Sequence, residues 1–234
     1  MRSDKHTTQF DELGSKYEQV YGRNQAQIDF INKAIALLPR PAQGHPVRIL
    51  DVGVGTGKPT SELAAAAGIE VHGFDYSSTM VDIARKNVPS GRFEQAHHLD
   101  FSPGSFTDKE SEGGVYDGIF AIFSTAALSK SEFRTLVTER FSRWVKKGGY
   151  VFIGNFSLKD FPEGSEITER DDESAKVASR FFGITQRFLV WTDEGWKRLL
   201  EHAGFEVVEK WVVGFQPDAD CSWEPHEFTV ARRG

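Results

Sequence analysis

Three alternating glycines are the residues whose type and spacing point most directly to chemistry. Gly53, Gly55 and Gly57 follow an apolar, β-branched run from Val47 to Val52, which predicts a buried strand, and Lys58–Ala67 then predicts a helix. Glycines between a strand and a helix let a ligand approach the main chain, and the helix start favours negative charge. A glycine turn also suits a βα connection that binds nothing, so a second signal is required.

That second signal is an acidic residue. Ile69–Phe74 predicts another strand, and Asp75 stands at its end, about 20 residues beyond the glycine turn, where a carboxylate accepts hydrogen bonds from a ribose. The pair of signals favours a nucleoside-type cofactor. The G-x-G-x-G spacing argues against a nicotinamide dinucleotide, which remains an alternative, and Pro59 after Lys58 excludes a Walker phosphate loop.

Four segments, taken in order, resemble the class I S-adenosylmethionine-dependent methyltransferases of the small-molecule type. They are Leu50–Gly57, Gly73–Ser77 with Met80, Lys147–Gly149 and Ala203–Phe205, within a span of roughly residues 45 to 231. The resemblance implies an α/β fold: a Rossmann-like three-layer α/β/α sandwich with a mostly parallel sheet. It also implies a C-terminal antiparallel hairpin, whose last strand is inserted between two others.

The resemblance further implies S-adenosylmethionine as cofactor and S-adenosylhomocysteine as product. The implied cofactor-binding residues are Tyr17, Asp51, Gly53, Val54, Gly55, Thr56, Asp75, Tyr76, Met80, His97, His98 and Phe123. Tyr76 and Met80 are expected to sandwich the adenine, although core packing explains Met80 equally well. The family usually has an aspartate where His97 stands, so His97, Asp100 or the main chain of His98 is expected to accept the adenine amino group.

Composition bounds the class of protein. A chain of 234 residues is sufficient for a single domain over 1–234. A net charge of -6 argues against nucleic-acid and anionic-membrane partners. There is no signal peptide pattern and no run long enough to span a membrane. The single cysteine, Cys221, allows no intrachain disulfide, and a cytoplasmic location is expected.

Two regions are expected to cover the site. Residues 1–45 predict an N-terminal helical cover: Phe10–Leu38 reads as helical with a break near Gly22, and Tyr17 and Tyr21 share one face. Residues 156–191 form a candidate substrate cap insertion. There the charge run from Glu163 to Glu173 is expected to be solvated, and the aromatic second half is expected to face the substrate.

Methyl transfer from a sulfonium is an in-line displacement, so the protein must align the reactants and exclude water. A general base is needed only when the acceptor loses a proton. The weak candidates are His97, His98 and His226, each of which is also readily explained as a structural histidine. No ligand cluster predicts a metal.

The sequence therefore predicts a methyltransferase that acts on oxygen, nitrogen or carbon of a small, largely apolar molecule. The alternative is a cofactor-binding member of the same fold that is non-catalytic or repurposed. The motifs specify neither the acceptor nor the oligomeric state.

Overall fold

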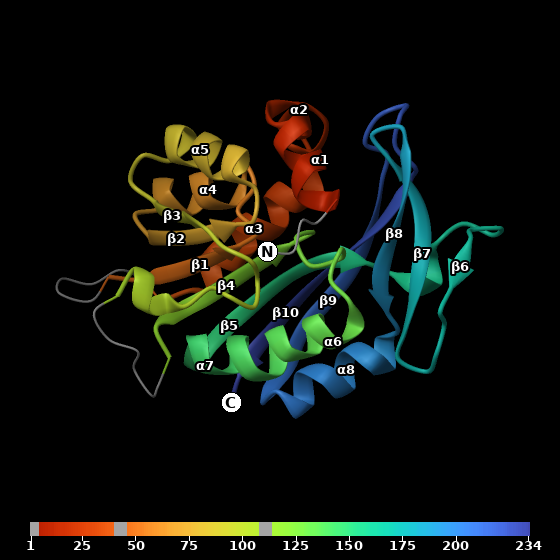
Figure 1. Cartoon of the computed structure of the whole chain (residues 1–234). Coiled ribbons are helices and arrows are strands. Elements are labelled where there is room, and N and C mark those ends of the chain that lie inside the picture. The colour runs from red at the N-terminus through yellow and green to blue at the C-terminus, as the bar shows by residue number, and fades with distance from the viewer. Residues whose placement is uncertain (1–4, 40–45, 108–113) are drawn as a thin grey trace.

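A mixed sheet organises the molecule, which is described by a computed structural model over residues 5–39, 46–107 and 114–234 (Figure 1). Its seven strands lie in the order β3-β2-β1-β4-β5-β10-β9. They span β1 Arg48–Val52, β2 Glu70–Asp75, β3 Arg92–Gln95, β4 Tyr116–Ile122, β5 Val145–Phe156, β9 Phe205–Phe215 and β10 Glu224–Arg233. The first five strands in this order, β3, β2, β1, β4 and β5, are parallel to one another. Strand β10 is antiparallel to both of its neighbours, β5 and β9. The predicted fold class and the inserted last strand are confirmed.

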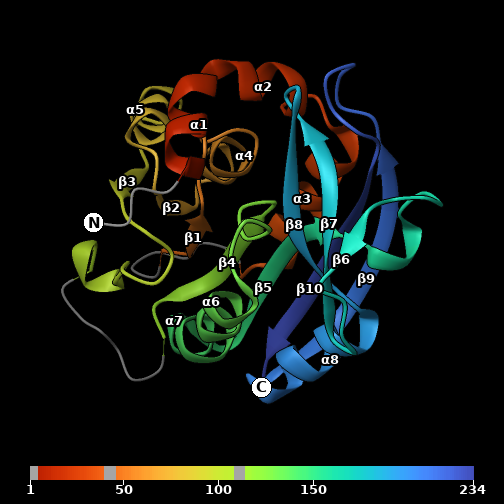
Figure 2. The ribbon, with the colours of Figure 1, turned by 45° about the vertical axis from the view of Figure 1, so that its right-hand side comes forward.

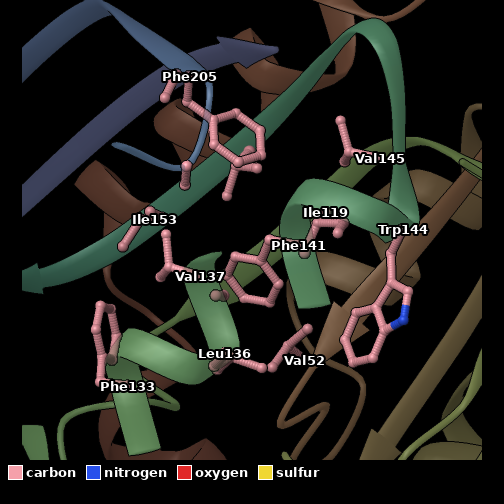
Figure 3. Close-up of a cluster of buried hydrophobic side chains, with 14 of the residues drawn as sticks. Val52, Ile119, Phe133, Leu136, Val137, Phe141, Trp144, Val145, Ile153 and Phe205 are labelled. Carbon is pink, nitrogen blue, oxygen red and sulfur yellow. The ribbon is translucent and has the colours of Figure 1, made fainter. Parts of the chain in front are cut away.

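Helices cover both faces of this sheet (Figure 1). One face carries α3 (Gln25–Leu37), α4 (Thr60–Ala66) and α5 (Ser78–Asn87), whose apolar side chains pack on β1, β4 and β10. The other carries α6 (Lys130–Thr135), the π-helical turn η2 (Leu136–Phe141), α7 (Ser142–Trp144) and α8 (Asp193–His202). Figure 3 shows the core of this second face, where Phe133, Leu136 and Phe141 point at the strand side chains Val52 and Ile153. No helix in the described ranges has the length and apolarity to cross a membrane.

One predicted helix boundary is wrong. The helix expected from Lys58 begins at Thr60, because the turn continues through Pro59 and the Glu62 N–H bonds the carbonyl of Gly57 at 2.9 Å. The spacing Ser129-Lys-Ser-Glu132 predicts a capping box at the start of another helix, and the structure confirms it.

The helix that this box opens is expected to reach about Val145, and it ends one residue earlier. It passes through the π-helical turn and ends at Trp144, and Val145 already pairs with Tyr116 in the sheet. Gly148, with a φ of 76°, lies in the irregular first part of β5, where a side chain favours other backbone conformations.

The N-terminal segment forms more helices than predicted. The break near Gly22 is present, and Gly14, with a φ of 49°, adds another. The chain therefore folds as α1 (Lys5–Leu13), α2 (Ser15–Tyr21) and α3. Residues 1–4 and 40–45 of the expected cover lie outside the described ranges.

The candidate cap segment contains a second, antiparallel sheet. Its strands are β6 (Ile167–Thr168), β7 (Ser174–Phe181) and β8 (Ile184–Trp191), after the short helix η3 (Leu158–Asp160). Figure 2 shows the β7–β8 hairpin rising beside α1 and α2. Rings of Phe10 and Phe181 lie 5.9 Å apart between them. The polar composition of residues 102–114 predicts a surface loop after β3. This loop holds the short helix η1 (Pro103–Ser105), and residues 108–113 lie outside the described part.

The inserted strand β10 should be essential to stability. Phe228 is fully buried, with its ring 4.8 Å from that of Phe30 in α3. Phe228→Ala is expected to lower the free energy of unfolding by about 3–5 kcal/mol, because it removes a large side chain and leaves a cavity. Val208→Ala on β9, where the side chain is 53% exposed, should change it by less than about 0.5 kcal/mol. Urea unfolding measures both, and equal effects would contradict the packing described.

Candidate functional site

A cavity of about 1020 Å³ lies at the carboxyl ends of the parallel strands. Its walls come from the sheet edge, from α1 and α2, and from β7 and β8. The lining residues are Phe10, Tyr17, Tyr21, Gly53, Gly55, Asp75, Tyr76, Met80, Glu94, Gln95, Ala96, His97, His98, Leu99, Asp100, Ile122, Phe123, Ser124, Ala126, Ala127, Leu128, Phe156, Phe181, Gln186, Phe188 and Glu224. This is where open α/β sheets bind ligands.

The glycine turn forms one wall. Gly53 has a φ of 68°, and a Cβ there would lie 2.3 Å from the Cβ of Ser124, so only glycine fits beside the end of β4. Gly55 also has a positive φ, but a Cβ there would meet no heavy atom within 4 Å. The main chain at Gly55 is thus open to the cavity, as a close ligand approach requires.

Asp75 connects β2 to this turn. One carboxylate oxygen accepts the Gly55 N–H at 3.0 Å and the other accepts the Ser77 N–H at 2.9 Å. The side chain of Ser77 in turn caps α5 by accepting the Met80 N–H at 3.1 Å. Burial raises the pKa of Asp75 to about 6, against the lowering effect of these main-chain donors. Asp75 therefore holds the turn in place while presenting a carboxylate to the cavity.

Three predicted cofactor residues do not line the cavity. Asp51 is buried behind the turn, where it accepts the hydroxyl of Ser61 at 2.7 Å. Burial raises its pKa to about 7, and the nearby Asp75 adds to the shift. Val54 and Thr56 are also buried, and the Val54 N–H bonds the Phe74 carbonyl at 2.9 Å. Their contribution is to the shape of the turn.

The predicted adenine residues do lie together along the cavity. Tyr76, Met80, His97 and His98 all line it. His98 is buried, and neither of its ring nitrogens makes a hydrogen bond of good geometry within the described residues. Burial and the neighbouring His97 lower the pKa of His98 to about 4, so its ring is neutral at pH 7. A neutral imidazole offers one donor and one acceptor to a ligand.

Phe123 is strained at the end of β4. Its φ of 54° is unusual for a residue with a side chain, and its N–H still bonds the Gly154 carbonyl at 2.8 Å. This conformation places its ring 4.1 Å from that of His226, centroid to centroid. Phe123 thus separates His226 from the cavity that Phe123 itself lines.

The other end of the cavity is aromatic. Tyr17 and Tyr21 of α2 stack with ring centroids 4.9 Å apart, and Tyr21 lies 5.9 Å from Phe181 of β7. Phe156 and Phe188, whose ring centroids lie 5.4 Å apart, also line this end of the cavity. This end is suited to an apolar molecule.

A buried polar chain that the sequence did not predict crosses this aromatic end. Tyr21 donates its hydroxyl to Glu224 at 2.9 Å, and the other oxygen of Glu224 lies 2.7 Å from Nε2 of His226. Nδ1 of His226 lies 2.9 Å from Nδ2 of Asn24. Glu224 lines the cavity, whereas His226, predicted as a candidate base, does not.

A sequence signal for Glu224 did exist. Glu224, His226 and Phe228 alternate on one face of β10, and two titratable groups on a buried face are unusual.

Among the described residues, one group of side chains has metal-ligand spacing: Asp171, Asp172 and Glu173. It lies outside the cavity. Lys130 pairs with Asp171 and Glu173, and Arg134 pairs with Glu173. These ion pairs account for the group, and it is not interpreted as a metal site.

Comparison with known proteins identifies the family. Residues 49–149 match the methyltransferase domain model. The O-methyltransferase cnsE of Penicillium expansum is 28% identical over 181 residues, which cover 77% of this chain and 59% of that protein. The chain spans about half the length, 39–65%, of the first curated relatives it matches. Residues 49–149 thus form a methyltransferase domain of the class I S-adenosylmethionine-dependent superfamily.

Solved structures share the fold at low sequence identity. Magnesium protoporphyrin IX methyltransferase from Synechocystis PCC 6803, solved with bound S-adenosylhomocysteine, superposes with a TM-score of 0.64 at 15% identity, over 99% of this chain and 100% of that one. The (4+2)-cyclase SpnF superposes with a TM-score of 0.65 at 17% identity, over 98% and 96% of the two chains. At these identities the similarity concerns the fold alone.

The raised pKa of Asp51 gives a prediction for stability. Because the folded-state pKa of about 7 exceeds the ordinary aspartate pKa of 3.8, the folded protein keeps a proton that the unfolded chain has lost. This contribution is present at low pH and is lost as pH rises through 7. Asp51→Asn keeps an acceptor for Ser61 but does not titrate, so between pH 5 and 8 wild type should lose about 2–3 kcal/mol more than this variant.

Urea unfolding at several pH values measures this difference, with the exposed Asp82→Asn as control. If wild type and Asp51→Asn show the same pH dependence, Asp51 does not hold a proton in the folded state.

Proposed function

We propose that this protein transfers a methyl group from S-adenosylmethionine to a small, largely apolar molecule. The single observation that supports this most strongly is the carboxylate of Asp75, which lines the cavity beside the open main chain of Gly55. Superfamily membership supplies the cofactor class. The cavity, at about 1020 Å³, has room for the cofactor and a small acceptor together.

The polar groups of the cavity would suit the polar parts of the cofactor. Asp75 would accept the two ribose hydroxyls, since each carboxylate oxygen has an acceptor site beyond the main-chain bond it already makes. The main chain of Gly53 and Gly55 would hold the methionine part, on a turn whose shape depends on Asp51, Val54 and Thr56. Tyr76 and Met80 would enclose the adenine.

His98, with no hydrogen-bonded partner of good geometry, would meet the adenine edge together with His97. The cofactor supplies a methyl group on a positively charged sulfur.

The covering elements would exclude water. Phe10 of α1 connects Tyr17 of α2 with Tyr76 beside the cofactor wall, because its ring centroid lies 6.0 Å from that of each tyrosine. Glu18 of α2 pairs with Lys58 of the glycine turn at 3.3 Å, and Gln9 of α1 contacts Gln186 of β8. These contacts hold the cover against both the cofactor wall and the aromatic wall.

A second candidate function has a specific observation in its favour. SpnF, which shares this fold, is a (4+2)-cyclase, so the fold also serves chemistry other than methylation. A cofactor-binding protein that catalyses no methyl transfer would still need Asp75. Release of S-adenosylhomocysteine in the presence of an acceptor distinguishes the two functions.

Asp75→Ala tests the proposed function. Two hydrogen bonds to a charged group, partly replaced by water, should cost about 2–4 kcal/mol of cofactor binding, which is about 30- to 1000-fold in affinity. Isothermal titration calorimetry with S-adenosylmethionine measures this loss. The exposed Asp82→Ala on α5 is the control and should bind as wild type does.

A structural role for Asp75 predicts another outcome. Its bonds to Gly55 and Ser77 make it a local brace, whose loss lowers the free energy of unfolding by about 0.5–2 kcal/mol. A lowered melting point with unchanged cofactor affinity would remove the main support for this function.

A further inference from the structure

The charges that line the cavity are all of one sign. The acidic residues are Asp75, Glu94, Asp100 and Glu224, and no Lys or Arg is among the described lining residues. Such a surface repels an acceptor that carries a phosphate or carboxylate. Of the four, Glu224 lies at the aromatic end, next to Tyr21.

Local hydrogen bonds fix the tautomer of His226. Oδ1 of Asn24 accepts the Gln27 N–H at 3.3 Å and thereby caps α3, which turns Nδ2 of Asn24 toward His226. An amide nitrogen only donates, so Nδ1 of His226 accepts. In the neutral ring the proton then lies on Nε2, which donates to Glu224 at 2.7 Å.

The carboxylate of Glu224 accepts hydrogen bonds from two neighbours. Burial and the negative charge of Glu224 raise the pKa of Tyr21, so its hydroxyl keeps its proton and donates to Glu224. Both carboxylate oxygens of Glu224 therefore accept a hydrogen bond, one from Tyr21 and one from His226. Glu224 is 2% exposed, and its only ion-pair partner among the described residues is His226, so no Lys or Arg balances its charge there. A buried carboxylate without a cation is costly, unless a ligand supplies the positive charge.

We propose that the methyl acceptor is an amine, bound as its ammonium ion between Glu224 and the aromatic rings of α2, β7 and β8. This inference rests on the proposed function. Aromatic faces attract an ammonium ion when it is desolvated, and a carboxylate then completes its coordination. Tyr17, Tyr21 and Phe181 provide the rings around this position.

Proton transfer to Glu224 precedes methyl transfer. The ammonium passes one proton to an oxygen of Glu224, which leaves a neutral amine and a neutral carboxylic acid. The nitrogen lone pair forms the new N–C bond, the C–S bond breaks, and its electron pair stays on sulfur. Glu224 then releases its proton to solvent. Desolvation raises the pKa of a carboxyl and lowers that of an ammonium, so the proton transfer is easier in this cavity than in water.

Three probes of one shape and different charge test the inference. Benzylamine, benzyl alcohol and benzoate are titrated by calorimetry into wild-type protein saturated with S-adenosylhomocysteine. Benzylamine is expected to bind about 10- to 100-fold more tightly than benzyl alcohol, and benzoate the most weakly. Glu224→Gln should bring the amine and the alcohol within about threefold of each other.

Glu227→Gln is the matched control. Glu227 is equally buried on β10, but its partner is Lys210 at 3.2 Å and it does not line the cavity. It should keep the wild-type preference for the amine. Glu224→Asp, which shortens the side chain by one methylene and withdraws the carboxylate, should reduce the preference for the amine, and this variant serves if Glu224→Gln does not fold.

Two results would overturn the inference: equal binding of amine and alcohol by the wild-type protein, or an undiminished preference in Glu224→Gln. Failure of wild type to bind S-adenosylhomocysteine would instead overturn the proposed function itself, so the two failures are distinguishable.

Discussion

Buried negative charge is the constraint on which the site depends. Asp75 and Glu224 are 7% and 2% exposed, line one cavity and face no Lys or Arg within the described lining. Burying a charge without a partner is costly. The protein meets part of that cost with neutral donors: the N–H groups of Gly55 and Ser77 for Asp75, and Tyr21 and His226 for Glu224. A ligand with hydroxyl donors at one end and positive charge near the other would supply the remaining hydrogen bonds and the counter-charge.

The fold brings these two carboxylates to the same cavity from distant parts of the chain. Asp75 stands at the carboxyl end of a parallel strand, and Glu224 stands at the amino end of β10. Because β10 runs antiparallel between β5 and β9, its amino end reaches the edge where the parallel strands end. The cores on the two sheet faces hold this edge rigid, and a third apolar cluster joins α1 and α2 to the β7–β8 hairpin.

Local patterns in the sequence were sufficient for much of this arrangement. The glycine turn with Asp75, the strand Arg92–Gln95, the Ser129 capping box and the helix Asp193–His202 were all predictable, because each depends on residues close together in the chain. The alternation along β10 marks Glu224 as a residue of a buried strand face, but its partner was not predictable, because Tyr21 lies 203 residues away in the chain. His226 was predicted as a candidate base because it is a histidine, but Phe123 separates its ring from the cavity. The π-helical turn and the three-stranded sheet depend on tertiary packing that no short pattern encodes.

The central claim is that the buried carboxylate of Asp75 binds the ribose hydroxyls of the cofactor. Proton release on cofactor binding tests this claim most directly. The pKa of Asp75 is about 6 in the free protein, so at pH 6 about half of the molecules hold this proton. Ribose hydroxyls that donate to the carboxylate favour its ionised form and lower that pKa. Calorimetric titration with S-adenosylhomocysteine at pH 6, in two buffers of different ionisation enthalpy, should show release of up to about half a proton per molecule bound. Asp75→Asn should release markedly less. Binding with no proton released by wild type, or with the same release in Asp75→Asn, would contradict the account.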